Sequence, residues 1–187
     1  MKSNGNKIYR IYDKSLHQWF EVPKEYYEIP LGEPDVKREG KDVTFLTIGA
    51  TLYKAIEAAD MLKEKYGMEA EVIDARSIVP FNYDKVIASV KKTGRIIIAS
   101  DACARGSFLN DLAANITTLC FDDLDAAPVV LGSRNWITPC HELEESFFPQ
   151  ATWFLDAINE QIVPLKDWVP TSNQTSAQKI IRAKKGV

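Results

Sequence analysis

Four charged residues occupy positions where this chain could hold a ligand: Asp74, Arg76, Asp101 and Arg105. Each comes at or just beyond the end of a predicted strand, and open α/β sheets bind ligands beyond the carboxyl ends of their strands. A helix predicted to begin near Ser107 would also offer free backbone amides to an anion. The same charges could instead be ordinary loop residues, and Asp74 and Arg76 could form an ion pair. The sequence therefore leaves two interpretations open: these residues bind a ligand, or they have only a structural role.

The other reactive side chains predict no catalytic centre. His17 and His141 are the only histidines and lie near no nucleophile pattern, so we expect both to be structural or surface residues. Cysteines stand at three positions without CxxC spacing, which argues against a disulfide framework or a zinc site: Cys103, Cys120 and Cys140. The segment 48–51 holds one glycine and is a weak candidate for a phosphate cradle. We expect neither an active site nor a bound cofactor in this chain.

Composition narrows the class of protein. A chain of 187 residues with 45% hydrophobic and 26% charged residues has the size and composition of one globular domain with flanking segments. The net charge of −3 argues against nucleic acid as a partner. No apolar run approaches the roughly 20 residues that span a bilayer, and no secretory signal leads the chain. We therefore expect a cytoplasmic protein without a membrane partner.

The elements that must position these residues alternate between strands and helices. Apolar runs predict buried strands over 43–48, 69–74, 95–100 and 128–131. Helical spacing of apolar residues predicts helices after each of the first three strands, with Gly67 and Gly94 as C-terminal caps, and another helix over 152–161. This alternation predicts a mostly parallel sheet with helices on both faces.

The segments on either side of this domain have different compositions. Residues 1–40 contain three prolines and many aromatic side chains, which predicts an extended arm that packs on a surface rather than a solvated linker. Residues 41–165 form the predicted domain. Residues 166–187 are predicted to be a polar tail, and it contains four cations near its end: Lys179, Arg182, Lys184 and Lys185.

Several motifs together resemble the transketolase C-terminal domain. The first is Glu21-Val-Pro-Lys-Glu-Tyr-Tyr-Glu-Ile-Pro-Leu-Gly32, followed by Asp35-Val-Lys-Arg-Glu-Gly40. Glu71-Val-Ile-Asp-Ala-Arg76 and Ile78-Val-Pro-Phe81 continue the likeness. The form that these motifs resemble most is the one in β subunits of thiamine-diphosphate-dependent 2-oxo acid dehydrogenases, those acting on pyruvate, acetoin or branched-chain 2-oxo acids. The resemblance covers roughly residues 7–163.

The resemblance implies a three-layer α/β/α domain whose five-stranded, mostly parallel sheet has one antiparallel edge strand. It also implies that thiamine diphosphate and Mg lie in other domains of the complete enzyme, so that the isolated chain is inactive. The arm would then leave a preceding pyrimidine-binding domain that is absent here. The chain would serve as an assembly domain in a homo- or hetero-oligomer and could contact an acyltransferase core.

The sequence also offers candidates for such an interface. Interfaces bury aromatic anchors, and the aromatic candidates are Trp136, Phe147, Phe148, Trp153 and Phe154. Several of these must also belong to the core. An acidic group could dock a basic domain of the acyltransferase or could be a solvated face: Asp122, Asp123 and Asp125. The alternative hypotheses are a free-standing nucleotide- or small-molecule-binding module that uses the four charged loop residues, and a scaffold without a ligand.

Overall fold

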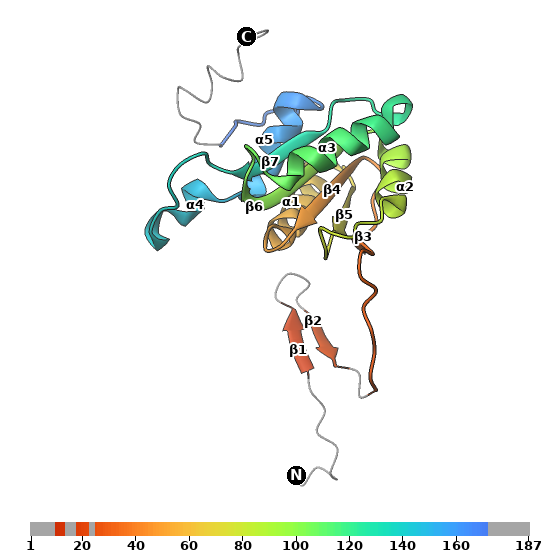
Figure 1. The fold of residues 1–187 in the computed structure, drawn as a ribbon. Coiled ribbons are helices and arrows are strands. Elements are labelled where there is room, and N and C mark those ends of the chain that lie inside the picture. The colour runs from red at the N-terminus through yellow and green to blue at the C-terminus, as the bar shows by residue number, and fades with distance from the viewer. Residues whose placement is uncertain (1–9, 14–17, 23–24, 172–187) are drawn as a thin grey trace.

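A computed structural model describes residues 10–13, 18–22 and 25–171. The predictions made for His17 and for the four basic residues near the C-terminus lie outside this part of the chain. Within it, five strands form one sheet in the order β3-β5-β4-β6-β7 (Figure 1). Their bounds are Asp35–Arg38 for β3, Val43–Ile48 for β4, Ala70–Asp74 for β5, Ile96–Cys103 for β6 and Val129–Ser133 for β7.

The pairing register gives each face of the sheet a continuous apolar row. Phe45 on β4 lies opposite Val72 on β5 and Ile97 on β6. The next residue, Leu46, lies opposite Ile73 and Ile98. Because successive strand residues point to opposite faces, the first row faces one layer and the second row faces the other. All six side chains are fully buried.

Helices cover both faces, as the alternation of strands and helices predicts. Helix α1 (Thr51–Tyr66) and α5 (Ala151–Gln161) pack on the face of Phe45. Helix α2 (Asp84–Thr93) and α3 (Phe108–Leu119) pack on the face of Leu46. Gly67 and Gly94 end α1 and α2 with φ of 66° and 68°, in the left-handed region that a C-terminal cap requires. The expected three-layer fold is therefore confirmed.

The antiparallel edge strand begins inside the predicted arm. Residues 35–38 fall within the arm predicted over 1–40, yet they form β3 and pair antiparallel with β5. The sequence alone did not reveal this strand, because three of its four residues are charged, as in a polar turn. Gly40 then crosses the start of β5 so closely that a Cβ there would lie 2.2 Å from the carbonyl carbon of Ala70. The arm proper therefore ends before Asp35.

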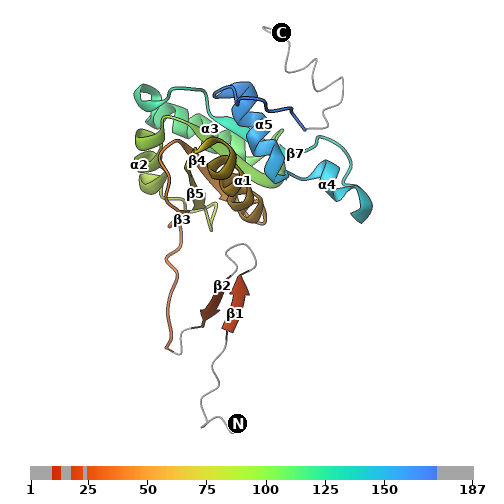
Figure 2. The same cartoon turned by 180° about the vertical axis from the view of Figure 1, so that it is seen from behind.

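The arm itself forms a hairpin that the sequence did not predict. Strands β1 (Arg10–Asp13) and β2 (Gln18–Glu21) pair only with each other, and Tyr12 lies opposite Trp19 with their ring centroids 5.1 Å apart. In both views the hairpin lies apart from the five-stranded sheet and is joined to it by an extended segment (Figures 1 and 2). No described helix is long and apolar enough to cross a bilayer.

The beginning of the predicted polar tail is anchored to the domain. The Asp156 side chain on α5 is buried, and its carboxylate accepts hydrogen bonds from Trp168 Nε1 at 2.8 Å and from the Thr171 amide at 3.0 Å. Lys65 on α1 lies over the Trp168 ring, 5.5 Å from its centroid. Residues 166–171 are therefore a strap over α1 and α5. The prediction of a tail missed this strap because its carboxylate anchor lies ten or more residues earlier in the chain.

An ion pair between the buried Glu71 and the more exposed Lys92 holds α2 to the amino ends of the strands. Glu71 on β5 is 3% exposed, and its carboxylate accepts hydrogen bonds from Lys92 and from the Gly40 amide, the latter at 3.2 Å. Burial by itself raises the pKa of Glu71, but these donors and Ser89 outweigh that effect and hold the pKa below its ordinary value of 4.5. Glu71 is therefore ionised in the folded protein.

We expect Glu71→Gln to lower the free energy of unfolding at neutral pH by about 1–3 kcal/mol, because Lys92 loses its buried partner. The stabilisation from a lowered pKa is complete above pH 4.5 and is lost as the pH falls through the folded value. Urea titrations at pH values on either side of 4.5 should show a smaller loss of stability on acidification in the variant than in the wild type. The exposed Glu57→Gln should stay within about 0.5 kcal/mol of wild type. Equal acid sensitivity of wild type and Glu71→Gln would contradict this account.

We expect Asp156→Ala to lower the free energy of unfolding by about 1–3 kcal/mol, because the half-buried Trp168 Nε1 and the Thr171 amide lose a buried acceptor. Hydrogen exchange should show faster exchange of the Thr171 amide, with little change in β4. The exposed Glu64→Gln serves as the matched control in the neighbouring helix. Unchanged exchange at Thr171 in Asp156→Ala would show that the strap does not depend on this carboxylate.

Candidate functional site

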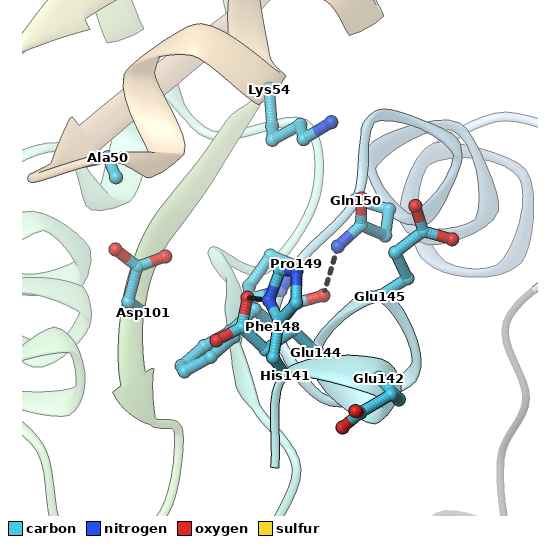
Figure 3. A pocket seen from close by; sticks show the side chains of 10 residues that line it. All are labelled: Ala50, Lys54, Asp101, His141, Glu142, Glu144, Glu145, Phe148, Pro149 and Gln150. Atoms are coloured by element: carbon cyan, nitrogen blue, oxygen red, sulfur yellow. Dashed lines mark hydrogen bonds and ion pairs between the residues drawn. The ribbon is translucent and has the colours of Figure 1, made fainter. Parts of the chain in front are cut away.

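A hollow of about 850 Å³ lies at the carboxyl ends of β4 and β6 (Figure 3). The chain passes from β4 to β5 on one side of β4 and then returns to β6 on its other side, so the strand order reverses between β4 and β6. Ligands of open α/β sheets bind at such a reversal. Ala50, Lys54 and Asp101 form one wall of the hollow, and the segment from His141 to Gln150 forms the other.

Asp101 belongs to β6, which runs three residues beyond the predicted end of this strand. Its carboxylate accepts a hydrogen bond from the Ala50 amide at the start of α1. Burial raises the pKa of Asp101, and the hydrogen bond from Ala50 counters part of that effect. The amino end of α1, where a phosphate would bind, therefore already holds a carboxylate from the chain itself.

The opposite wall consists of two short helices, η2 (His141–Leu143) and α4 (Glu144–Phe147). His141 Nδ1 lies 3.0 Å from Glu144 Oε2, and Gln150 Nε2 donates to the Phe148 carbonyl at 2.9 Å (Figure 3). The pKa of Glu142 is lowered by a hydrogen bond from its own amide and by a second one from Cys140. This wall is therefore mainly acidic.

The charges of the hollow disfavour an anionic ligand. Carboxylates line it at four positions, Asp101, Glu142, Glu144 and Glu145, and Lys54 is the one lysine or arginine among the lining residues. A diphosphate placed there would meet repulsion from most sides. Among the residues that the structure describes, no group of three or more acidic, histidine or cysteine side chains could hold a metal ion. These residues therefore do not fit thiamine diphosphate with its metal.

The structure separates the four charged residues that the sequence grouped together. Arg76 Nη2 pairs with Asp35 Oδ2 on the edge strand at 2.5 Å, and Asp74 Oδ1 accepts from the Arg76 amide at 3.0 Å. Both side chains therefore stabilise the junction of β3 and β5. Arg105 is exposed in the loop after β6 and does not line the hollow. Of the four, the hollow includes Asp101 alone.

Three of the five aromatic interface candidates are core residues, which corrects that part of the prediction. Phe154 is fully buried against Phe45, with ring centroids 4.9 Å apart, while Phe147 and Trp153 are 4% and 5% exposed. Helical spacing could not separate an interface from the core, because both bury the same side chains. Trp136 remains 42% exposed, and Phe148 is half-buried beside the hollow.

The acidic candidates lie around the short helix η1 (Phe121–Asp123). Asp122 is exposed and Asp123 is half-buried. Asp125 Oδ2 lies 3.8 Å from Arg95 Nε, and its amide donates to the Gly94 carbonyl at 2.8 Å. Asp125 therefore has a structural contact of its own, while docking by this group stays a prediction.

Sequence reasoning missed two features of the surface. The first is the acidic wall of the hollow, because its approach to Asp101 depends on how the chain returns after β7. Exposed aliphatic side chains at Leu31 and Val79 were also missed, with exposures of 82% and 83%. Apolar residues beside prolines gave no signal that would distinguish a buried loop from an exposed one.

Comparison with known proteins identifies the domain. Residues 32–152 match the family described as "Transketolase, C-terminal domain". The chain is 48% identical over 106 residues to the acetoin:2,6-dichlorophenolindophenol oxidoreductase subunit beta of Bacillus subtilis, a match that covers 57% of this chain and 31% of that protein. It is 38% identical over 143 residues to the pyruvate dehydrogenase E1 component subunit beta of the same organism, covering 76% of this chain and 42% of that protein.

A solved structure supports the same assignment. A split-gene transketolase, described as an inactive beta4 tetramer, superimposes with a TM-score of 0.61 at 25% identity, covering 75% of this chain and 46% of that chain. The chain thus spans less than half the length of the relatives named here. The matched segment makes up more than half of this chain and contains the five-stranded sheet with helices α1, α2 and α3, so the chain belongs to the transketolase C-terminal domain family.

Proposed function

We propose that this chain is the C-terminal assembly domain of a thiamine-diphosphate-dependent 2-oxo acid dehydrogenase of the β-subunit type. One observation carries the proposal: the chain matches β subunits named for acetoin, pyruvate and 2-oxoisovalerate oxidation, yet it spans only 31%, 42% and 32% of them. The complete enzyme would decarboxylate a 2-oxo acid oxidatively and pass the acyl group to a lipoyl carrier. The isolated chain would contribute no catalytic group.

Thiamine diphosphate and Mg would bind in the portion of the enzyme that this chain does not span. The acidity of the hollow supports this division, because a diphosphate needs cationic or amide donors and the amide of Ala50 is already bonded to Asp101. No step of the reaction is therefore assigned to residues of this domain. Its contribution would be to hold the subunits together.

The proposed partners are the other domains or subunits of the dehydrogenase, in a homo- or hetero-oligomer in the cytoplasm. Relatives named as subunits, and a relative described as a tetramer, support an oligomer. An acyltransferase core is a further proposed partner, with exposed Asp122 as its strongest candidate contact. Asp125 contributes less to such a contact, because it already lies near Arg95.

A chimera tests this proposal. Residues 25–187 would replace the matching C-terminal portion of the B. subtilis acetoin relative, and the product would be assayed for dichlorophenolindophenol reduction with the companion subunits of that enzyme. We expect activity within about tenfold of the parent, and none from the isolated chain. A control truncated before the junction should be inactive. An inactive chimera that is folded and soluble would overturn the proposal.

Substitution of Asp101 distinguishes the assembly domain from the alternative, a free-standing binding module. Because burial raises the pKa of this carboxyl, ionised Asp101 opposes folding, and Asp101→Asn should raise the Tm at neutral pH. The isolated wild type should show no calorimetric signal with ATP, NAD or FMN, and the exposed Glu57→Gln on α1 should behave like wild type. Micromolar binding that Asp101→Asn abolishes would favour the module over the assembly domain.

A further inference from the structure

We propose that a pocket between the strap and helices α1 and α5 binds a small carboxylate with a flat apolar body. This strap pocket has a volume of about 540 Å³, within the range of roughly 300–1,000 Å³ that is typical of small-molecule sites. The last two turns of α1, the start of α5 and the strap line it. The strap, residues 166–171, lies outside the segment 32–152 that matches the family, so this site does not follow from the family assignment.

The Trp168 ring provides a fixed apolar wall. Trp168 is half-buried and packs against the core layer of α1 and α5. Its Nε1 donates at 2.8 Å to Asp156, which is 3% exposed, so the ring is held in one orientation. The half-buried side chains of Met61 and Tyr66 also line the pocket. A flat apolar group can therefore cover a rigid aromatic surface that loses little entropy on binding.

Two lysines make the strap pocket favourable for a single negative charge. Lys65 Nζ lies 5.5 Å from the centroid of the Trp168 ring, beside the surface that an apolar group would cover. Lys166 lines the pocket from the strap, and Asp167 is the one carboxylate among the lining residues. Two cations and one anion give the lining a net charge of +1, which matches a monoanion. The acidic hollow, with four carboxylates and one lysine, has the opposite character.

The start of α5 adds to this preference. Thr152 lines the pocket from the first turn of α5, where the helix dipole favours negative charge. A cationic ligand would instead meet two ammonium groups, and a bare inorganic anion would leave the aromatic wall uncovered. The ligand that uses both features of the pocket is a carboxylate attached to a flat apolar group.

Hydrogen bonds preform the strap side of the pocket. The Leu165 side chain is 7% exposed, and its amide donates to Asn159 Oδ1 at 2.8 Å. The Trp168 amide donates to the Leu165 carbonyl at 3.2 Å, which closes a tight turn. Asp167, within this turn, has a φ of 58°, in the left-handed region that aspartate tolerates better than most residues. Since the folded domain already holds this turn, a ligand does not have to order it.

Three probes test the strap pocket in the full chain: phenylacetate, acetate and benzylamine. Phenylacetate has both a carboxylate and a flat apolar group, acetate lacks the apolar group, and benzylamine joins the same benzyl group to a cation. Binding is followed by NMR through the indole Nε1–H signal of Trp168, which Trp168→Phe assigns. We expect phenylacetate to shift this signal with a Kd of about 1 mM or lower, and the other two probes to bind about tenfold more weakly or worse.

Substitution of the lysines locates the binding site. Lys65→Gln and Lys166→Gln should each weaken phenylacetate binding about threefold, and the double variant about tenfold, because exposed ion pairs contribute modestly. Lys63→Gln is the matched control, since Lys63 is an exposed lysine of the same helix that pairs with Glu69 at 3.4 Å and does not line the pocket. Its Kd should stay within about twofold of wild type. The Tm of each variant verifies that it folds.

Phenylacetate binding that both lysine variants weaken and Lys63→Gln preserves would support the site. An unchanged Trp168 signal far above the expected Kd would overturn it, as would affinity that neither lysine variant alters. Equal binding of acetate would indicate an adventitious ion only, and equal binding of benzylamine would indicate apolar contact without charge selection; either result overturns the proposal. These measurements do not use the chimera, so the strap pocket and the assembly function succeed or fail separately.

Discussion

The central strand β4 is the element on which the rest of the domain depends. It pairs in parallel on both sides, with β5 and β6, and its residues alternate between the two apolar layers. Phe45 contacts Phe154 of α5 on one face, while Leu46 belongs to the layer of α2 and α3 on the other. A parallel strand buried on both faces leaves no side for polar residues, so nearly every side chain of β4 is apolar or is a hydrogen-bonded threonine.

Those threonines show how the strand tolerates polar groups. Thr44 Oγ1 lies 2.6 Å from Ser89 Oγ and 2.8 Å from Thr93 Oγ1, which joins β4 to α2. Thr47 Oγ1 donates to the Ile73 carbonyl at 3.0 Å. Glu71 and Lys92 continue this polar contact at the amino ends of the strands. The polar groups thus fix helix α2 against the sheet, while the apolar rows supply most of the burial.

The point at which the strand order reverses, between β4 and β6, is a poor site for an anion in this domain. The reversal between β4 and β6 places Ala50 and Asp101 side by side, and the carboxylate satisfies an amide at the start of α1. A fold that often binds phosphates at this place therefore holds an acidic hollow instead. This acidity and the short span of the chain relative to its β-subunit relatives both support the assembly role proposed above.

The sequence by itself determined the order of the parallel strands along the chain, the helices between them and their glycine caps. These features follow from local periodicity, which a single segment reveals on its own. The resemblance to the family came from particular motifs and not from periodicity. Tertiary structure decided that 35–38 is an edge strand, that Asp156 holds the strap at 166–171, and that Phe147, Trp153 and Phe154 belong to the core. It also paired Arg76 with Asp35 and placed Asp101 beside Ala50. Each of these outcomes depends on which segments, distant in sequence, meet in space, and local periodicity contains no information about that pairing.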